Sequence, residues 1–228
     1  RFDVNTQSLL SVVDRVGKKD AGKTINMHRA VALQTNPAKL FITQPWTMAF
    51  KNNTADAFVV SAASNVLVKL TVNLTTGLAT VKRDPSDPTR VLEIKTGKNP
   101  RGIVINGDDT RAYVMNYISR DVAVVDLTSS PEAVTETMKS ENLPAPGTKQ
   151  DKIHIGKELY NTSVGEFDPP AAGQPSIVGR MSQAGWGSCS SCHTPFGLSD
   201  NVVWIFGGGP RRTIPQHTDF DQTDPTRK

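Results

Sequence analysis

The 228-residue sequence is poor in cysteine and histidine. It has only two cysteines, Cys189 and Cys192, and four histidines. A chain of this length can bury a sizeable core without disulfide staples, so both thiols are available for chemistry. A structural zinc site needs four ligands, usually from a second C-x-x-C or H-x-H pair. His28, His154 and His217 are distant in sequence from the cysteines and from one another, so we do not expect zinc.

Long apolar runs and runs of like charge are also absent. The longest apolar runs, such as residues 202–206, are far shorter than the roughly 20 residues that span a membrane, so we expect no transmembrane segment. Lys and Arg together number 26 against 22 for Asp and Glu. This small excess is spread along the chain, with no basic stripe interleaved with aromatic residues. We therefore expect no nucleic-acid partner.

The two cysteines occur in the order C-x-x-C-H, which is the attachment pattern of a c-type haem. Two thiols three positions apart can reach both vinyl groups of one porphyrin, and His193 then supplies an imidazole to the iron. A thioredoxin-like redox pair would need a βαβ context, whereas the flanks here are rich in Gly and Ser. The sequence thus predicts one haem c, anchored by Cys189 and Cys192. Such haem is normally attached after export, so we expect a periplasmic or cell-surface protein.

A second motif lies near the amino terminus, where residues 17–24 fit the phosphate-loop pattern G-x-x-x-x-G-K-T. Strand-like residues 8–16 precede it, and a short helix is predicted at residues 27–33. Asn36-Pro37 ends that helix after about two turns, and the chain then reads as antiparallel strands rather than repeated βαβ units. We therefore interpret residues 17–24 as a basic, solvated turn.

An internal repeat follows, with an offset of 55 positions, as between Pro45 and Pro100. Each copy reads strand, polar turn, strand, short turn, strand, and residues 91–94 supply another strand before the second copy. Four short antiparallel strands per repeat are typical of a propeller blade, whose usual period is about 40 to 50 residues. The excess lies in residues 75–90, where the sequence Asp-Pro-Ser-Asp-Pro marks an inserted loop.

The second copy, PRGIVINGDDTRAYVMNYISRDVAVVDL, resembles the YVTN-type β-propeller repeat, with residues 113–116 at the family's signature position. The resemblance implies a partial propeller over residues 1–128, with repeats at about 45–72 and 100–127. A propeller closes with about four to eight blades, and open sheet edges invite pairing. We therefore expect further chains or segments to complete the propeller.

Residues 129–150 combine prolines with Ser, Thr, Glu and Lys, which predicts a linker. A helical pattern begins at Asp151, which is a suitable capping residue. We expect residues 151–228 to form a separate haem domain, truncated at Lys228. The predicted fold class is an all-β partial propeller of antiparallel blades followed by a small, mainly α cytochrome c-like domain.

The last third of the chain contains an ordered series of motifs. They are GKELY at 156–160, RMS at 180–182, CSSCH at 189–193, GLSD at 197–200 and GPRRT at 209–213. This series resembles the amino-terminal haem domain of the bacterial di-haem cytochrome c peroxidases, the group that includes MauG-type enzymes. The resemblance implies that Cys189 and Cys192 are the thioether anchors and that His193 is the proximal iron ligand.

The sequence does not identify the sixth ligand of the haem iron. Relatives with a bis-histidine haem often carry the distal histidine a few residues before Gly-Pro-Arg, where this chain has Trp204, which cannot ligate iron. The position is therefore empty, or filled by His217, Met181 or His154. An open position would let peroxide bind, whereas a second strong ligand would suit electron transfer.

Peroxide reduction in this family uses two haems, and this chain has a single C-x-x-C-H. Two functions follow: peroxidase-like redox activity with electrons from an external donor, or an electron-transfer carrier or propeller docking module without catalysis. The expected partner is a redox protein or a small oxidant such as peroxide. Arg211 and Arg212 are expected to pair with haem propionates, with simple solvated charges as the equal alternative.

Overall fold

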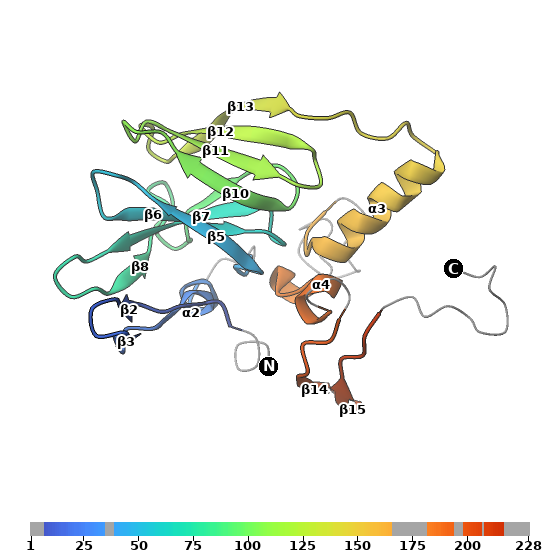
Figure 1. The fold of residues 1–228 in the computed structure, drawn as a ribbon, viewed down its shortest axis with the longest axis horizontal. Coiled ribbons are helices and arrows are strands. Elements are labelled where there is room, and N and C mark those ends of the chain that lie inside the picture. The colour runs from blue at the N-terminus through green and yellow to red at the C-terminus, as the bar shows by residue number, and fades with distance from the viewer. Residues whose placement is uncertain (1–6, 35–38, 166–181, 194–197, 207, 217–228) are drawn as a thin grey trace.

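The computed structural model describes residues 7–34, 39–165, 182–193, 198–206 and 208–216. Two antiparallel sheets with the strand order of propeller blades form its centre (Figure 1). The first blade contains β5 (Pro45–Phe50), β6 (Asp56–Ser61), β7 (Val66–Val72), β8 (Ala79–Val81) and β9 (Glu93–Lys95). The second blade contains β10 (Pro100–Ile105), β11 (Arg111–Asn116), β12 (Asp121–Asp126) and β13 (Ala133–Lys139).

The backbone conformation repeats with the same offset of 55 residues as the sequence. The first strand of each blade begins with Pro45 or Pro100, and each has the same register irregularity directly after that proline. The turn between the second and third strands repeats as well, because Asn65 and Arg120 both adopt left-handed conformations, with φ of 59° and 56°. The predicted antiparallel, propeller-like blades are therefore confirmed.

The fourth strand differs between the blades. In the first blade β7 pairs with β8 at one end and with β9 at the other, so the outer edge consists of two short pieces. The predicted insertion at residues 75–90 contains β8 itself, and residues 82–92 join it to β9. In the second blade β13 is continuous over seven residues and pairs with β12. Residues 133–139 belong to the predicted linker, so the second blade extends further than the sequence indicated. Val134 packs against the core between the blades, which anchors this otherwise polar strand.

Two apolar clusters hold the blades, and β6 contributes to both. Successive side chains of a strand point to opposite faces. Phe58 and Val60 enter the cluster between the blades, whereas Ala57 and Val59 enter the cluster against α2 (Met27–Ala32). All four are almost fully buried. β6 is therefore covered on both faces.

The amino-terminal residues cover the face of the first blade that points away from the second blade. β1 (Leu9–Leu10) pairs with β4 (Ile25–Asn26), and β2 (Val13–Asp14) pairs with β3 (Lys19–Asp20). Figure 1 shows this blue hairpin and α2 below the first blade. The predicted short helix is thus confirmed as α2.

The phosphate-loop motif lies at the end of this hairpin. The carboxylate of Asp14 accepts hydrogen bonds from the backbone N–H groups of Val16 and Gly17, each at 3.0 Å. A phosphate loop needs such amides for its ligand. The contacts favour the interpretation of residues 17–24 as a solvated turn.

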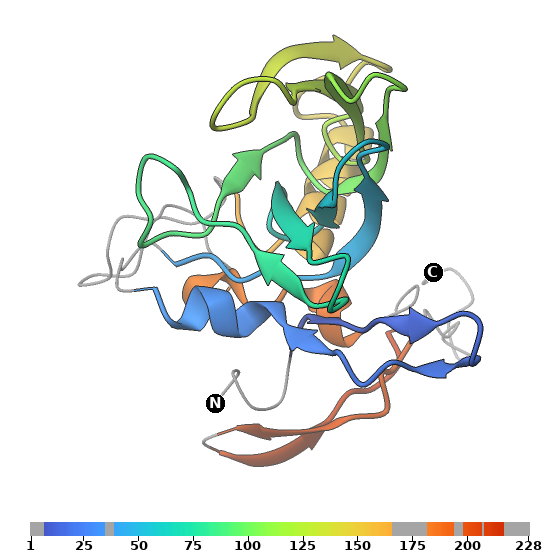
Figure 2. The same ribbon diagram turned by 90° about the vertical axis from the view of Figure 1, so that its left-hand side faces the viewer.

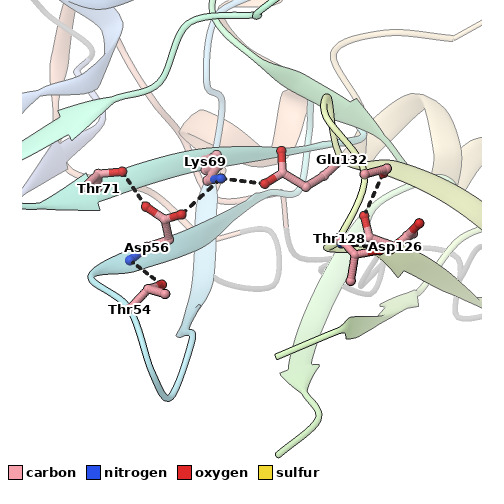
Figure 3. Close-up of polar contacts among 8 residues, drawn as sticks. Thr54, Asp56, Lys69, Thr71, Asp126, Thr128 and Glu132 are labelled. Carbon is pink, nitrogen blue, oxygen red and sulfur yellow. Dashed lines mark hydrogen bonds and ion pairs between the residues drawn. The ribbon is translucent and has the colours of Figure 1, made fainter. Parts of the chain in front are cut away.

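A charged network joins the two blades (Figure 3). Lys69 Nζ lies 3.0 Å from Asp56 Oδ2 in the same blade and 2.5 Å from Glu132 Oε1 before β13. The Lys69 side chain is 15% exposed and that of Glu132 is 7% exposed. Burial alone lowers the pKa of Lys69, but hydrogen bonds and charges from Glu132 and Asp56 outweigh it and raise this pKa above its ordinary value. The network therefore keeps the amine charged between the blades.

Substitution of Lys69 by methionine is expected to lower the free energy of unfolding by about 2 kcal/mol. The change leaves two carboxylates near each other without their cation, and partial solvent access keeps the cost below that of a fully buried pair. Urea unfolding measures it, with Lys95→Met at an exposed site of β9 as the control. Equal stability of the two variants would contradict a role for the network.

The chain after the second blade forms α3 (Lys149–Asn161), the 3-10 turn η1 (Gln183–Gly185), α4 (Cys189–Cys192), and a hairpin of β14 (Val203–Phe206) and β15 (Gly209–Arg212). The helix predicted from Asp151 is confirmed, but Thr148 caps it by accepting a hydrogen bond from the Asp151 N–H group. The hairpin projects away from the blades in both views (Figures 1 and 2).

The expected mainly α domain is not seen as a separate body in the described part of residues 151–228. α3 has no fully buried residue, α4 is a single turn, and the remaining regular structure there is a β-hairpin. The physical reason is that C-x-x-C-H specifies one local turn. It does not specify the helices that would surround that turn.

Candidate functional site

The segment that carries the cysteines is held on the ends of the blades. Ser163, just after α3, is fully buried, and both its N–H and its hydroxyl donate to the Ala63 carbonyl, at 2.7 and 2.9 Å. Asn99, at the start of the second blade, donates through Nδ2 to the Asn161 carbonyl at 3.1 Å. These contacts come from both blades. The segment is therefore packed against the sheets.

The C-x-x-C-H motif forms one helical turn. Ser188 and Ser191 cap this turn reciprocally, each side chain accepting from the other residue's backbone N–H. Residues three apart in a helix lie on the same side, which places Cys189 and Cys192 together. Both thiols are free. His193 ends the turn, and its carbonyl accepts a hydrogen bond from the Tyr160 hydroxyl of α3 at 3.2 Å.

The first blade positions this turn through side chains that precede β5. Gln44 Nε2 donates to Ser190 Oγ at 2.8 Å, inside the motif, and Thr43 Oγ1 donates to the Gly185 carbonyl at 2.6 Å. Gly185 has a φ of +62°, and a Cβ there would lie 2.8 Å from Leu40. The left-handed backbone conformation favours glycine here, and a side chain at this position would require Leu40 to move.

Both thiols and His193 line one open pocket of about 310 Å³. Its other walls come from Ser188 and from residues in or beside the β14–β15 hairpin: Trp204, Arg211, Arg212, Thr213, Ile214 and Gln216. Trp204 is buried, and its Nε1–H donates to Asp200 Oδ2 at 3.0 Å and to Thr213 Oγ1 at 3.1 Å. The indole is thus fixed as a wall of the pocket.

The Cys192 thiol and the His193 imidazole have different environments. Burial, followed by the nearby Asp200 and Cys189, raises the pKa of the Cys192 thiol to about 11, so this thiol stays protonated at neutral pH. His193 Nδ1 is buried and has no hydrogen-bond partner among the described residues. Buried nitrogens are normally paired, so this unpaired one is unusual.

These residues fit a covalently attached haem. Two free thiols on one helical turn open onto the same pocket as the His193 imidazole. The described residues contain no group of three or more His, Cys, Asp or Glu side chains arranged around a metal ion. A haem iron takes four of its ligands from the porphyrin, so a single imidazole is enough to hold it from the protein side.

The remaining predicted residues are placed as follows. Arg211 and Arg212 line the pocket of the cysteines and are exposed at its rim. Met181 and His217, the proposed distal ligands, lie outside the described residues. His154, on α3, lines a different hollow and is not among the residues that line the cysteine pocket.

Sequence reasoning missed Gln44, Thr43 and Tyr160 as positioning residues. Gln44 and Ser190 are 146 positions apart, and no local pattern in the sequence connects them. Tyr160 belongs to the GKELY motif, so its resemblance to the haem-domain series was a usable signal.

Parts of this chain are similar in fold to parts of several solved structures. No family model and no curated protein matches this sequence. A functionally unknown protein from Desulfotomaculum acetoxidans is 15% identical with a TM-score of 0.44, covering 60% of this chain and 37% of that one. Hydrazine synthase from Kuenenia stuttgartiensis is 17% identical with a TM-score of 0.33, covering 43% and 24%. The periplasmic gluconolactonase of Pseudomonas aeruginosa is 12% identical with a TM-score of 0.42, covering 62% and 37%.

This chain spans between about a quarter and two-fifths of the length of those three proteins. The blades are identified by their strand order and by the internal repeat. In the part of the chain that the structure describes, no helix is long and apolar enough to cross a membrane.

Proposed function

We propose that this chain is an electron-transfer module in which a haem c is held at the end of a propeller blade. Cys189 and Cys192 anchor the haem, and His193 is the proximal ligand. The observation that carries the proposal is the pocket onto which both free thiols and this imidazole open. The bound haem supplies a one-electron redox couple.

The surrounding side chains hold and shield the group. The buried Trp204 excludes water from part of the pocket, and a lower local polarity tunes a redox potential. Arg211 and Arg212 place two positive charges at the rim, where guanidinium groups can pair with propionates. Gln44 fixes the C-x-x-C-H turn from the first blade.

The proposal includes a location and partners. Haem c is normally attached after export, so we place the protein in a periplasm or on a cell surface. The partner is a redox protein that docks near the exposed rim of the pocket. Further blades, from other segments or chains, complete the propeller.

A peroxidase-like activity is the second candidate. Trp204 lines the pocket with its N–H already donated to Asp200 and Thr213, in the neighbourhood where bis-histidine relatives carry their distal ligand. An iron without a sixth ligand could bind peroxide, with electrons from an external donor.

The spin state of the oxidised, haem-loaded protein separates the two functions. A six-coordinate, low-spin spectrum without turnover of hydrogen peroxide supports electron transfer, whereas a high-spin spectrum with turnover supports the peroxidase-like reaction. His193→Ala is expected to change the spectrum, and His154→Ala, in a different hollow, should leave it unchanged. A chain that never takes up haem under conditions that mature other c-type cytochromes would overturn both.

A further inference from the structure

A second hollow lies between α3 and the second blade, away from the cysteines. It consists of two adjoining pockets of about 280 and 350 Å³, which share Arg120, His154 and Lys157 as lining residues. None of the residues that line the cysteine pocket lines this hollow. Volumes of this size accommodate a small organic ligand.

The shared wall of the hollow is electropositive. His154 and Lys157 are three positions apart on α3 and therefore face the same side, toward Arg120 in the β11–β12 turn. Lys157 is exposed and forms no ion pair with any described residue. The pKa of His154 is lowered, first by burial and then by the positive charges of Arg120, Lys157 and Lys98, against the opposing Glu158.

Arg120 has partners that a ligand can replace or share. Its Nη1 lies 3.2 Å from Glu141 Oε1 and donates to the Asn142 carbonyl at 2.9 Å. The Glu141 side chain is 70% exposed, and ion pairs so accessible to water contribute little. An incoming oxyanion can therefore take the place of Glu141.

Asn116 forms part of the wall of the hollow. Its side chain is almost completely buried, and its Nδ2 donates to Asp121 Oδ1 at 2.6 Å. Its Oδ1 has no hydrogen-bond partner among the described residues. Because this oxygen has almost no accessible surface, it belongs to the packed wall and is not a contact for a ligand in the hollow.

We propose that this hollow binds a small organic anion through a carboxylate or phosphate group. The oxyanion contacts Arg120, Lys157 and the N–H of a neutral His154, because charge-assisted hydrogen bonds favour this pairing. The body of the ligand lies against Met115 and Tyr117, which supply apolar surface. This site is independent of the haem and of the function proposed above.

Calorimetric titration of the intact protein with inorganic phosphate, and separately with succinate, tests the proposal. We expect saturable binding of at least one of the two, and the tighter one identifies the preferred oxyanion. Lys157→Ala should raise the dissociation constant about tenfold or more, since a charged hydrogen-bond donor is lost. Lys152→Ala removes the same charge from an exposed position of α3 outside the hollow and should change it less than about twofold.

The proposal would be overturned by an absence of saturable binding of either anion, by equal weakening by Lys157→Ala and Lys152→Ala, or by binding that none of the variants changes. Equal weakening would mean that the anions respond only to net charge. His154→Gln serves as a second variant that keeps a hydrogen-bond donor and the fold of α3. It should weaken binding less than Lys157→Ala, and tighter binding than in the wild type would also contradict the site. Anions that bind instead at Arg211 and Arg212 would be insensitive to all three changes.

Discussion

Replacing Cys189 and Cys192 together by alanine is expected to abolish covalent haem attachment completely. The chain has no other cysteine, so the double variant has no thiol to form a thioether. Haem staining of a denaturing gel, with the mass of the intact chain, measures the result. The wild-type chain should carry one haem through denaturation, and the double variant should carry none.

The single variants are the matched controls. Cys189→Ala and Cys192→Ala each keep one thiol on the same helical turn, so each should retain some covalently bound haem. Cys189 is exposed and Cys192 is half-buried, so alanine at these positions is not expected to unfold the blades. Haem that stayed bound to the double variant after denaturation would contradict the assignment of C-x-x-C-H as the site of attachment.

Substitution of Phe58 by alanine is expected to lower the free energy of unfolding by about 3–5 kcal/mol. Phe58 is fully buried in the cluster between the blades, and Lys69 Nζ lies 5.9 Å from the centroid of its ring. Alanine would leave a cavity between two sheets that cannot collapse without separating their strands. Because folded domains have a total stability of about 5–15 kcal/mol, this single change removes a large part of it.

Phe50→Ala is the matched control, because Phe50 lies at the end of β5 with 51% of its surface exposed. It should cost less than about 1 kcal/mol. Urea unfolding followed by tryptophan fluorescence compares the two variants. A Phe58→Ala protein as stable as Phe50→Ala would contradict the placement of Phe58 between the blades.

The blades were predictable because their signals are local. Alternation of apolar and polar residues defines strands such as β6, and repetition of the same alternation after 55 positions identified two equivalent units. The helix α3 was predictable for the same reason, although its predicted start at Asp151 lies two residues after the observed start at Lys149. The pattern of neighbouring residues was enough to predict these elements.

The fourth strands and the expected helical domain were not predictable in this way. β13 has the polar sequence of a linker, and it becomes a strand because β12 offers an unpaired edge and the core accepts Val134. The motif near Cys189 indicated a cytochrome-like helical domain, whereas the described residues around it pack on the blades through Thr43, Gln44 and Ser163. Such contacts depend on partners more than a hundred positions away.

For the C-x-x-C-H motif, the sequence and the tertiary structure provide different information. The sequence alone indicated which side chains would hold a haem, because two thiols and an imidazole at this spacing form the attachment pattern of a c-type haem. Only the tertiary structure decided what surrounds them: the Trp204 wall, the arginines at the rim, the support from Gln44, and the separate electropositive hollow around His154. Reactivity depends on residue type and local spacing, whereas a pocket forms where distant segments meet, and their meeting is set by packing of the whole chain.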